Sequence, residues 1–150
     1  MIPPSLSVDT TDAGANAAPA IVSLRADNVE LPELSTVTFE QGMGTIIATF
    51  HDTDLDDTLY GKVFVDYSSN DPTPARASCV SAGTTVERTC TLPLTGLCQN
   101  DDIGATRVMQ VMVFDREVLE TGVQPLFQAM PPGGLSTSRV YFLKCQGRGQ

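Results

Sequence analysis

The stretch LYGKVFVDYS, residues 59–68, alternates its side chains between two faces. Leu59, Val63 and Val65 share one face, and Phe64 lies on the other. A period of two residues is the signature of a β-strand, whereas a helix would repeat every 3.6 residues. The stretch therefore predicts a strand with one face in a hydrophobic core.

Short runs of the same kind follow one another along the chain, separated by polar turns. They cover residues 20–25, 36–39, 44–51, 76–80, 86–92, 107–115 and 138–145. Only residues 29–34 and 121–130 could carry a helical turn, and neither shows a sustained helical period. Seven to nine short strands predict an all-β, immunoglobulin-like antiparallel β-sandwich, with an isolated antiparallel barrel as the alternative.

The length of 150 residues is typical of one domain. Residues 1–18 are rich in small and polar residues and predict a flexible linker, and residues 147–150 predict a polar tail. The sandwich is expected between them, over residues 19–146. Apolar residues make up 41% of the chain, which suffices for a core, while charged residues are only 18%.

The formal net charge of −9 argues against two classes of partner. An acidic surface repels both the phosphate backbone of nucleic acids and anionic membrane surfaces. No run of 18 apolar residues occurs, so no membrane span is expected. The charge is compatible with solubility outside the cell and with divalent cations.

The chain contains four cysteines at positions without the spacing of a zinc site: Cys79, Cys90, Cys98 and Cys145. No C-x-x-C pair is present, and the single histidine, His51, lies far away in sequence. An even number of cysteines without metal spacing predicts disulfides and an oxidising, extracytoplasmic compartment. Four buried free thiols in a cytosolic protein are the alternative.

Four cysteines allow three pairings, one of which fits a simple geometry. The predicted strands on either side of the polar turn around Gly83 can form a hairpin with Cys79 opposite Cys90. Opposed strand residues lie about 4.5–5.5 Å apart at Cα, within reach of a disulfide. That pairing leaves Cys98 for Cys145.

Three stretches carry a resemblance: NAAPAI (16–21), FHDTDLDDTL (50–59) and VMVFDR (111–116). Over residues 16–145 the chain resembles immunoglobulin-like and cadherin-like domains of bacterial surface proteins. It also resembles exported bacterial lipoproteins, so the resemblance implies a secreted, periplasmic or cell-surface module, with a lipid anchor upstream as one option. The chain has no Trp, and its cysteines do not lie in the second and penultimate strands, so antibody-like recognition is not implied.

The acidic turn of Asp52, Asp54, Asp56 and Asp57 is the candidate metal site. Carboxylates this close repel one another, and calcium, which takes six to eight oxygen ligands, would relieve the repulsion. The turn is not an EF-hand, because position six would be Asp57 and position twelve Val63. The alternative is a solvated turn in which the Asp side chains bond to nearby backbone amides.

Apolar residues on the outward faces of two strands form a candidate interface. Phe64 lies on one strand, Met112 and Phe114 on the other, and Tyr141 or Leu143 could extend the stripe. If exposed, such a stripe would mark a surface for a protein partner or for self-association.

The connection over residues 116–137 offers the alternative to that interface. It is longer than a simple connecting loop, and Leu126, Phe127 and Met130 could cover the stripe when the connection folds back.

No catalytic constellation accompanies these features, so an enzyme is not expected. Nucleophilic chemistry would have to use His51, and no G-x-S-x-G turn is present. We expect a non-catalytic exported module with a structural or adhesive role, acting through protein–protein contacts and able to self-assemble. A calcium- or carbohydrate-binding module is the alternative, although the chain offers few aromatic residues for a sugar platform.

Overall fold

The computed structural model describes residues 17–119 and 123–148, and within them the chain forms nine strands and one short 3-10 helix. The predicted linker and tail therefore lie mostly outside the described residues. The elements are β1 (Ala20–Ala26), β2 (Val29–Glu30), β3 (Thr36–Glu40), β4 (Thr45–His51), β5 (Leu59–Val65), β6 (Ala77–Ser81), β7 (Glu87–Pro93), η2 (Asn100–Asp102), β8 (Thr106–Phe114) and β9 (Ser136–Gln146).

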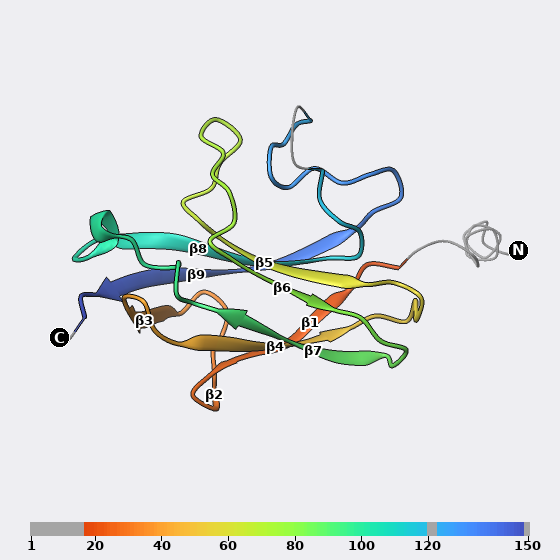
Figure 1. Cartoon of the computed structure of the whole chain (residues 1–150), viewed down its shortest axis with the longest axis horizontal. Coiled ribbons are helices and arrows are strands. Elements are labelled where there is room, and N and C mark those ends of the chain that lie inside the picture. The colour runs from red at the N-terminus through yellow and green to blue at the C-terminus, as the bar shows by residue number, and fades with distance from the viewer. Residues whose placement is uncertain (1–16, 120–122, 149–150) are drawn as a thin grey trace, which may run out of the picture.

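The strands form two sheets packed face to face (Figure 1). The first sheet has the order β2-β1-β4-β7, and the second has the order β3-β9-β8-β5-β6. All neighbours are antiparallel except β3 and β9, which run parallel. Two packed sheets with nine mostly antiparallel strands make an all-β sandwich, so the predicted fold class is confirmed. Within the described ranges, no helix is long and apolar enough to cross a membrane.

The core lies between the sheets and follows from the period-two alternation. Ile46, Ala48 and Phe50 of β4 are completely buried against Val63 of β5 and Val111 of β8. Each fully buried aliphatic or aromatic side chain contributes about 1.5–3 kcal/mol relative to exposure. The inward face predicted for Leu59, Val63 and Val65 is therefore the one that the core uses.

The segment over residues 29–34, which could have carried a helical turn, begins instead with strand β2 and contains no helix. Asp27 and Asn28 both adopt positive φ angles, 51° and 64°, and close a two-residue hairpin between β1 and β2. Asp and Asn tolerate this backbone region better than other side chains, and the resulting turn matches the twist of the strands. A tight hairpin thus replaces the helical turn that the sequence allowed.

The pairing of Cys79 with Cys90 is as predicted, but the hairpin that carried the prediction is wrong. β6 pairs with β5 in the second sheet, and β7 pairs with β4 in the first. The disulfide, with 5.9 Å between Cα atoms, therefore clamps the edges of the two sheets together. The connection over residues 82–86 is long enough to change sheets, which a tight turn could not do.

Gly61 makes room for this clamp. It lies opposite Cys79 in the ladder, and a Cβ atom there would meet the Cys79 Sγ at 2.8 Å and the Phe50 ring at 3.2 Å. Real Cβ atoms essentially never approach another atom as closely as 2.8 Å, and 3.2 Å is tighter than most of their contacts. A side chain at position 61 would therefore displace the bridge and press on the ring.

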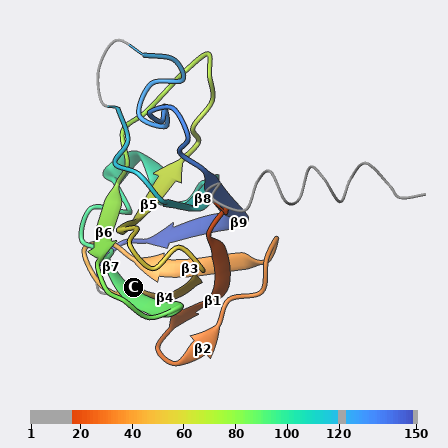
Figure 2. The same cartoon turned by 90° about the vertical axis from the view of Figure 1, so that its right-hand side faces the viewer.

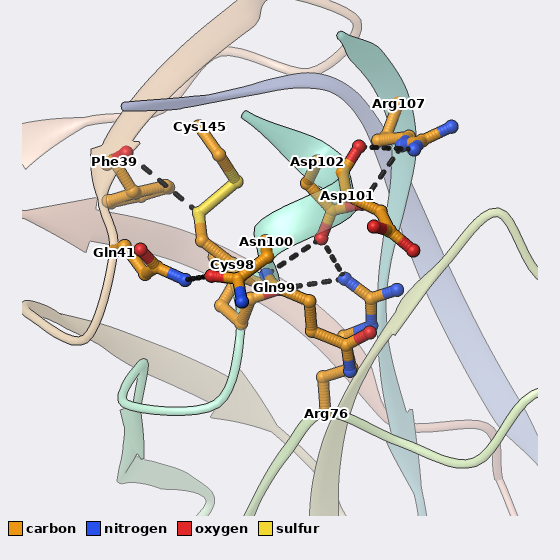
Figure 3. Close-up of a disulfide and its surroundings, with 11 residues drawn as sticks. Phe39, Gln41, Arg76, Cys98, Gln99, Asn100, Asp101, Asp102, Arg107 and Cys145 are labelled. Carbon is orange, nitrogen blue, oxygen red and sulfur yellow. Dashed lines mark hydrogen bonds and ion pairs between the residues drawn. A yellow bond between two sulfur atoms is a disulfide. The ribbon is translucent and has the colours of Figure 1, made fainter. Parts of the chain in front are cut away.

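The second disulfide, between Cys98 and Cys145, ties the loop after β7 to β9 (Figure 3). Beside it, the buried Asp102 carboxylate accepts hydrogen bonds from Arg76, from Arg107 and from the backbone amide of Gln99. Burial alone would raise the pKa of Asp102, but these donors outweigh it and hold the pKa below its usual value. This network fixes the loop between β7 and β8 in place.

Candidate functional site

The acidic turn connects β4 to β5 at one end of the sandwich, where His51 and Leu59 end and begin the flanking strands. One carboxylate oxygen from each of Asp52, Asp54 and Asp57 lies within 4.8 Å of the other two. Oxygen atoms that coordinate one calcium ion at 2.3–2.6 Å are separated by distances of this size. Three of the predicted ligands are therefore brought together.

Asp56, the fourth predicted ligand, is not part of the group. Its side chain is exposed and lines a neighbouring hollow of about 280 Å³ together with Tyr60 and Glu117. The turn from Asp54 to Asp57, closed by a backbone hydrogen bond of 3.1 Å between these two residues, directs position 56 outward. The prediction of four ligands is reduced to three.

Two oxygen atoms in the group lack the partners that buried oxygens normally have. The Oδ2 atoms of Asp52 and Asp57 are buried and, among the described residues, receive no hydrogen bond. The Oδ1 atom of Asp52 does accept one, from the backbone amide of Asp54 at 2.9 Å. The Oδ1 atom alone therefore agrees with the alternative to a metal site, a turn in which Asp side chains bond to nearby backbone amides.

Asp52 is almost completely buried, with 1% of its surface exposed. Burial raises the pKa of its carboxyl group, and the hydrogen bond from the Asp54 amide lowers it. The charges of Asp57 and Asp54, together with the close approach of the Asp57 carboxylate, raise it further, so that the pKa lies above the usual value. An ionised Asp52 is therefore costly in the free protein, and a bound cation would offset that cost.

Arg88 holds the turn from inside. Its guanidinium donates hydrogen bonds to the backbone carbonyl oxygens of Asp57, Asp54 and Thr85, and only 4% of its surface is exposed. These carbonyl groups point toward Arg88, which leaves the carboxylates as the ligands on offer. The sequence contained a signal for this contact, because Arg88 shares the inward phase of β7 with Cys90.

Two further contacts link the turn to distant segments. Arg116, at the start of the long connection, forms an ion pair of 2.8 Å with Oδ1 of Asp57. The backbone amide of Ala17 donates a hydrogen bond of 2.8 Å to Oδ2 of Asp54. The turn thus lies where the segment entering the sandwich meets the segment leaving β8.

The apolar stripe predicted as an interface is buried. Phe64 and Phe114 have no exposed surface, and Met112 retains only 7%. They form a second apolar cluster with Val118, on the outer face of the second sheet. The exposed interface is therefore corrected in favour of the alternative, a covered face.

The cover is the long connection after β8. Phe127 and Met130 pack against the cluster, as does Tyr67. The Tyr67 hydroxyl donates a hydrogen bond to the carbonyl of Leu126, so the loop after β5 and the long connection lie side by side above the sheet (Figures 1 and 2). Packing between these two loops is what the period-two pattern could not reveal.

Tyr141, the fourth predicted interface residue, belongs to the main core instead. Its ring is fully buried between the sheets, and its hydroxyl donates a hydrogen bond of 2.8 Å to the carbonyl of Leu31. Its strand, β9, places residues 141 and 143 on the inner face. The two positions proposed as extensions of the stripe therefore both point inward.

No protein-family model matches this chain, and none of the characterised proteins compared with it is significantly similar.

Proposed function

We propose that this protein is a non-catalytic, exported structural module in which Asp52, Asp54 and Asp57 bind a calcium ion. The observation that carries the proposal is the pair of buried Oδ2 atoms without hydrogen-bond partners, on Asp52 and Asp57. Two ionised carboxylates cannot donate to each other, and a bound cation satisfies both at once.

The donor set favours calcium over transition metals. Within the described residues the group consists of carboxylates alone, without the histidine or cysteine ligands that zinc and copper prefer. Calcium accepts irregular arrangements and completes its shell with water, whereas magnesium demands near-ideal octahedral geometry. Three carboxylates and several waters are the expected coordination.

A cation here would act structurally, because the turn is a junction. It would hold Asp54, which accepts from the amide of Ala17, and Asp57, which pairs with Arg116. Binding would therefore order the entry to β1 and the start of the long connection together. The two disulfides indicate an oxidising environment, and a secreted, periplasmic or cell-surface location agrees with it.

Carbohydrate binding has less support. Sugar platforms use exposed aromatic rings, whereas Tyr141 is buried and Tyr60 and Tyr67 are half-buried. The structural or adhesive role is retained, but it needs a contact surface other than the Phe64 stripe.

Isothermal titration calorimetry with calcium, after treatment with a chelator, tests the proposal. The wild-type protein should bind one ion, and Asp52→Asn should abolish binding. Asp56→Asn is the matched control, because it removes the same charge from the same turn but no ligand. Magnesium should bind more weakly.

Absence of heat at millimolar calcium would contradict the proposal. So would equal loss in Asp52→Asn and Asp56→Asn, because that result would indicate general attraction to an acidic loop.

A further inference from the structure

A groove opens between the two sheets on the side formed by β2 and β3. It has a volume of about 430 Å³ and is lined by the end of β1, by β2, by β3 and by the segment that joins β2 to β3. Leu31 and Val37, both buried, lie along it with the half-buried Phe39. The main core can therefore be reached from this side.

Strand β3 presents an open edge beside this groove. It pairs only with β9, and no other described strand lies next to it. The carbonyl of Ser35 accepts from Phe142 and the amide of Gln41 donates to Gln146, so odd-numbered residues bond to β9. In a parallel ladder the alternate residues turn their backbone groups the other way. The N–H and C=O groups of Thr36 and Thr38 therefore face outward.

On the opposite side of the sandwich, unlike the β3 side, a disulfide joins the two sheets. There β6 and β7 end the two sheets (Figure 2). The disulfide between Cys79 and Cys90 holds these two strands together. No disulfide joins β3 to the first sheet.

The charges around the groove select the kind of partner. Asp27 lines the groove and is exposed, and Glu33, also exposed, belongs to the segment that joins β2 to β3; these two residues form the acidic rim. Glu30 is partly neutralised by Arg25 at 3.9 Å and Arg139 at 3.7 Å. A second copy of the chain would bring the same acidic rim and a net charge of −9, which opposes self-association through this edge.

We propose that the open edge of β3 binds an extended segment of another protein, in which apolar β-branched residues alternate with polar ones and basic residues flank the run. The segment adds a strand to the second sheet through the backbone groups of Thr36 and Thr38. Every second side chain enters the groove and contacts Leu31 and Val37. The flanking basic residues meet the acidic rim. This site is separate from the calcium turn and does not depend on it.

Peptides of defined sequence test the proposal by fluorescence anisotropy in the presence of a chelator, which removes any contribution from calcium. The capped peptide KTVTVTVK should bind. The acidic peptide ETVTVTVE and the proline-interrupted peptide KTVTPTVK should bind at least about tenfold more weakly, because they lose the charge match or the backbone hydrogen bonds. Amide NMR shifts should concentrate on residues 36–40.

Thr38→Pro removes one outward N–H group, and edge strands tolerate proline at such positions. It should weaken binding by about five- to tenfold. Thr91→Pro is the matched control, because it removes an outward N–H group from β7, on the opposite side of the sandwich. The backbone hydrogen bonds from Asp52 to Val86 and from Leu94 to Gly44 show that the even-numbered residues of β7 bond to β4. The N–H group of Thr91 therefore faces away from β4.

Charge variants keep the test decisive if Thr38→Pro does not fold. Asp27→Asn preserves the positive φ of the turn, and Glu33→Gln preserves the shape of the side chain. Each substitution should weaken the binding of KTVTVTVK severalfold. Neither should weaken the binding of ETVTVTVE.

Three outcomes would overturn the proposal. They are NMR shifts confined to β6 and β7, equal effects of Thr38→Pro and Thr91→Pro, and a peptide-free dimer that forms through β3 in light-scattering measurements. The last outcome would make a second copy the occupant instead.

Discussion

The carboxylate of Asp52 lies next to that of Asp57 inside the turn after β4, and the Oδ2 atom of each is buried without a hydrogen-bond partner among the described residues. This pair of carboxylates has opposite effects on the stability of the free and of the calcium-bound protein. The same two charges destabilise the turn when no cation is present and coordinate the ion when it is.

Asp52→Asn should therefore invert the effect of calcium on stability. An Asn side chain still accepts from the Asp54 amide through its oxygen, and its NH2 group can donate to the Asp57 carboxylate. In chelator, the variant should be more stable than the wild type by about 1 kcal/mol. In calcium, only the wild type should gain stability. Urea unfolding in both conditions measures this, and a variant that is less stable in chelator would contradict the repulsion.

The pH dependence of the free protein should show the Asp52 charge separately. Burial raises the pKa of Asp52 in the folded state, so the folded protein binds the proton more tightly than the unfolded chain. Stability should then fall as the pH rises from about 4 through the raised pKa. Urea unfolding in chelator should show this decline, and the decline should be absent in Asp52→Asn.

Asp102 should act in the opposite direction. Its pKa is lowered by the Gln99 amide and the two guanidinium groups, against the effect of burial. The stability it contributes is present above its ordinary pKa of about 4 and is lost as the pH falls through the lowered value. Asp102→Asn should lower stability at pH 7 and flatten the acid limb of the curve. A slope below pH 4 that matches the wild type would place the acid sensitivity elsewhere.

The sequence predicted the sandwich because the core obeys a local rule. Leu59, Val63 and Val65 lie in the main core, and the same alternation places Phe64 on the opposite face, in the second apolar cluster. It also predicted the partner of Cys79, but through an incorrect hairpin. Whether β7 joins the sheet of β6 or crosses to the other sheet depends on how residues 82–86 pack. The alternation of apolar and polar residues does not determine this.

The acidic turn was found in part for a similar reason. Spacing brought Asp52, Asp54 and Asp57 together, but whether Asp56 joins them depends on the turn geometry. The alternation of β7 places Arg88 on its inner face together with Cys90. A buried guanidinium there needs hydrogen-bond acceptors. Which carbonyls it would hold could not be predicted, because they belong to a loop far away in the chain. The cover over Phe64 likewise depends on contacts between two loops.

The clamp between the sheets gives a prediction about coupling. Gly61→Ala should destabilise the protein by about 2 kcal/mol, because the added Cβ meets the Cys79 Sγ and the Phe50 ring. Gly83→Ala is the control, since its nearest atom would lie 3.9 Å away, and it should be close to neutral. Replacing Cys79 and Cys90 by Ala removes the bridge, at a cost of about 3 kcal/mol by the chain-entropy argument.

In that bridge-free background Gly61→Ala should cost distinctly less than in the wild type. Additive costs would mean that the two positions do not compete for space.

The cover over the second apolar cluster gives the last prediction. Phe127→Ala removes a half-buried ring that packs on the cluster of Phe64, Met112 and Phe114, and it should lower stability by about 2 kcal/mol. It should also increase binding of the dye ANS and make the mass in solution depend on concentration, because an uncovered apolar face on a sheet favours association. Val123→Ala, at an exposed position of the same connection, should change none of these. If Phe127→Ala lowers stability without uncovering the face, the loop after β5, held by Tyr67, is sufficient to cover the cluster.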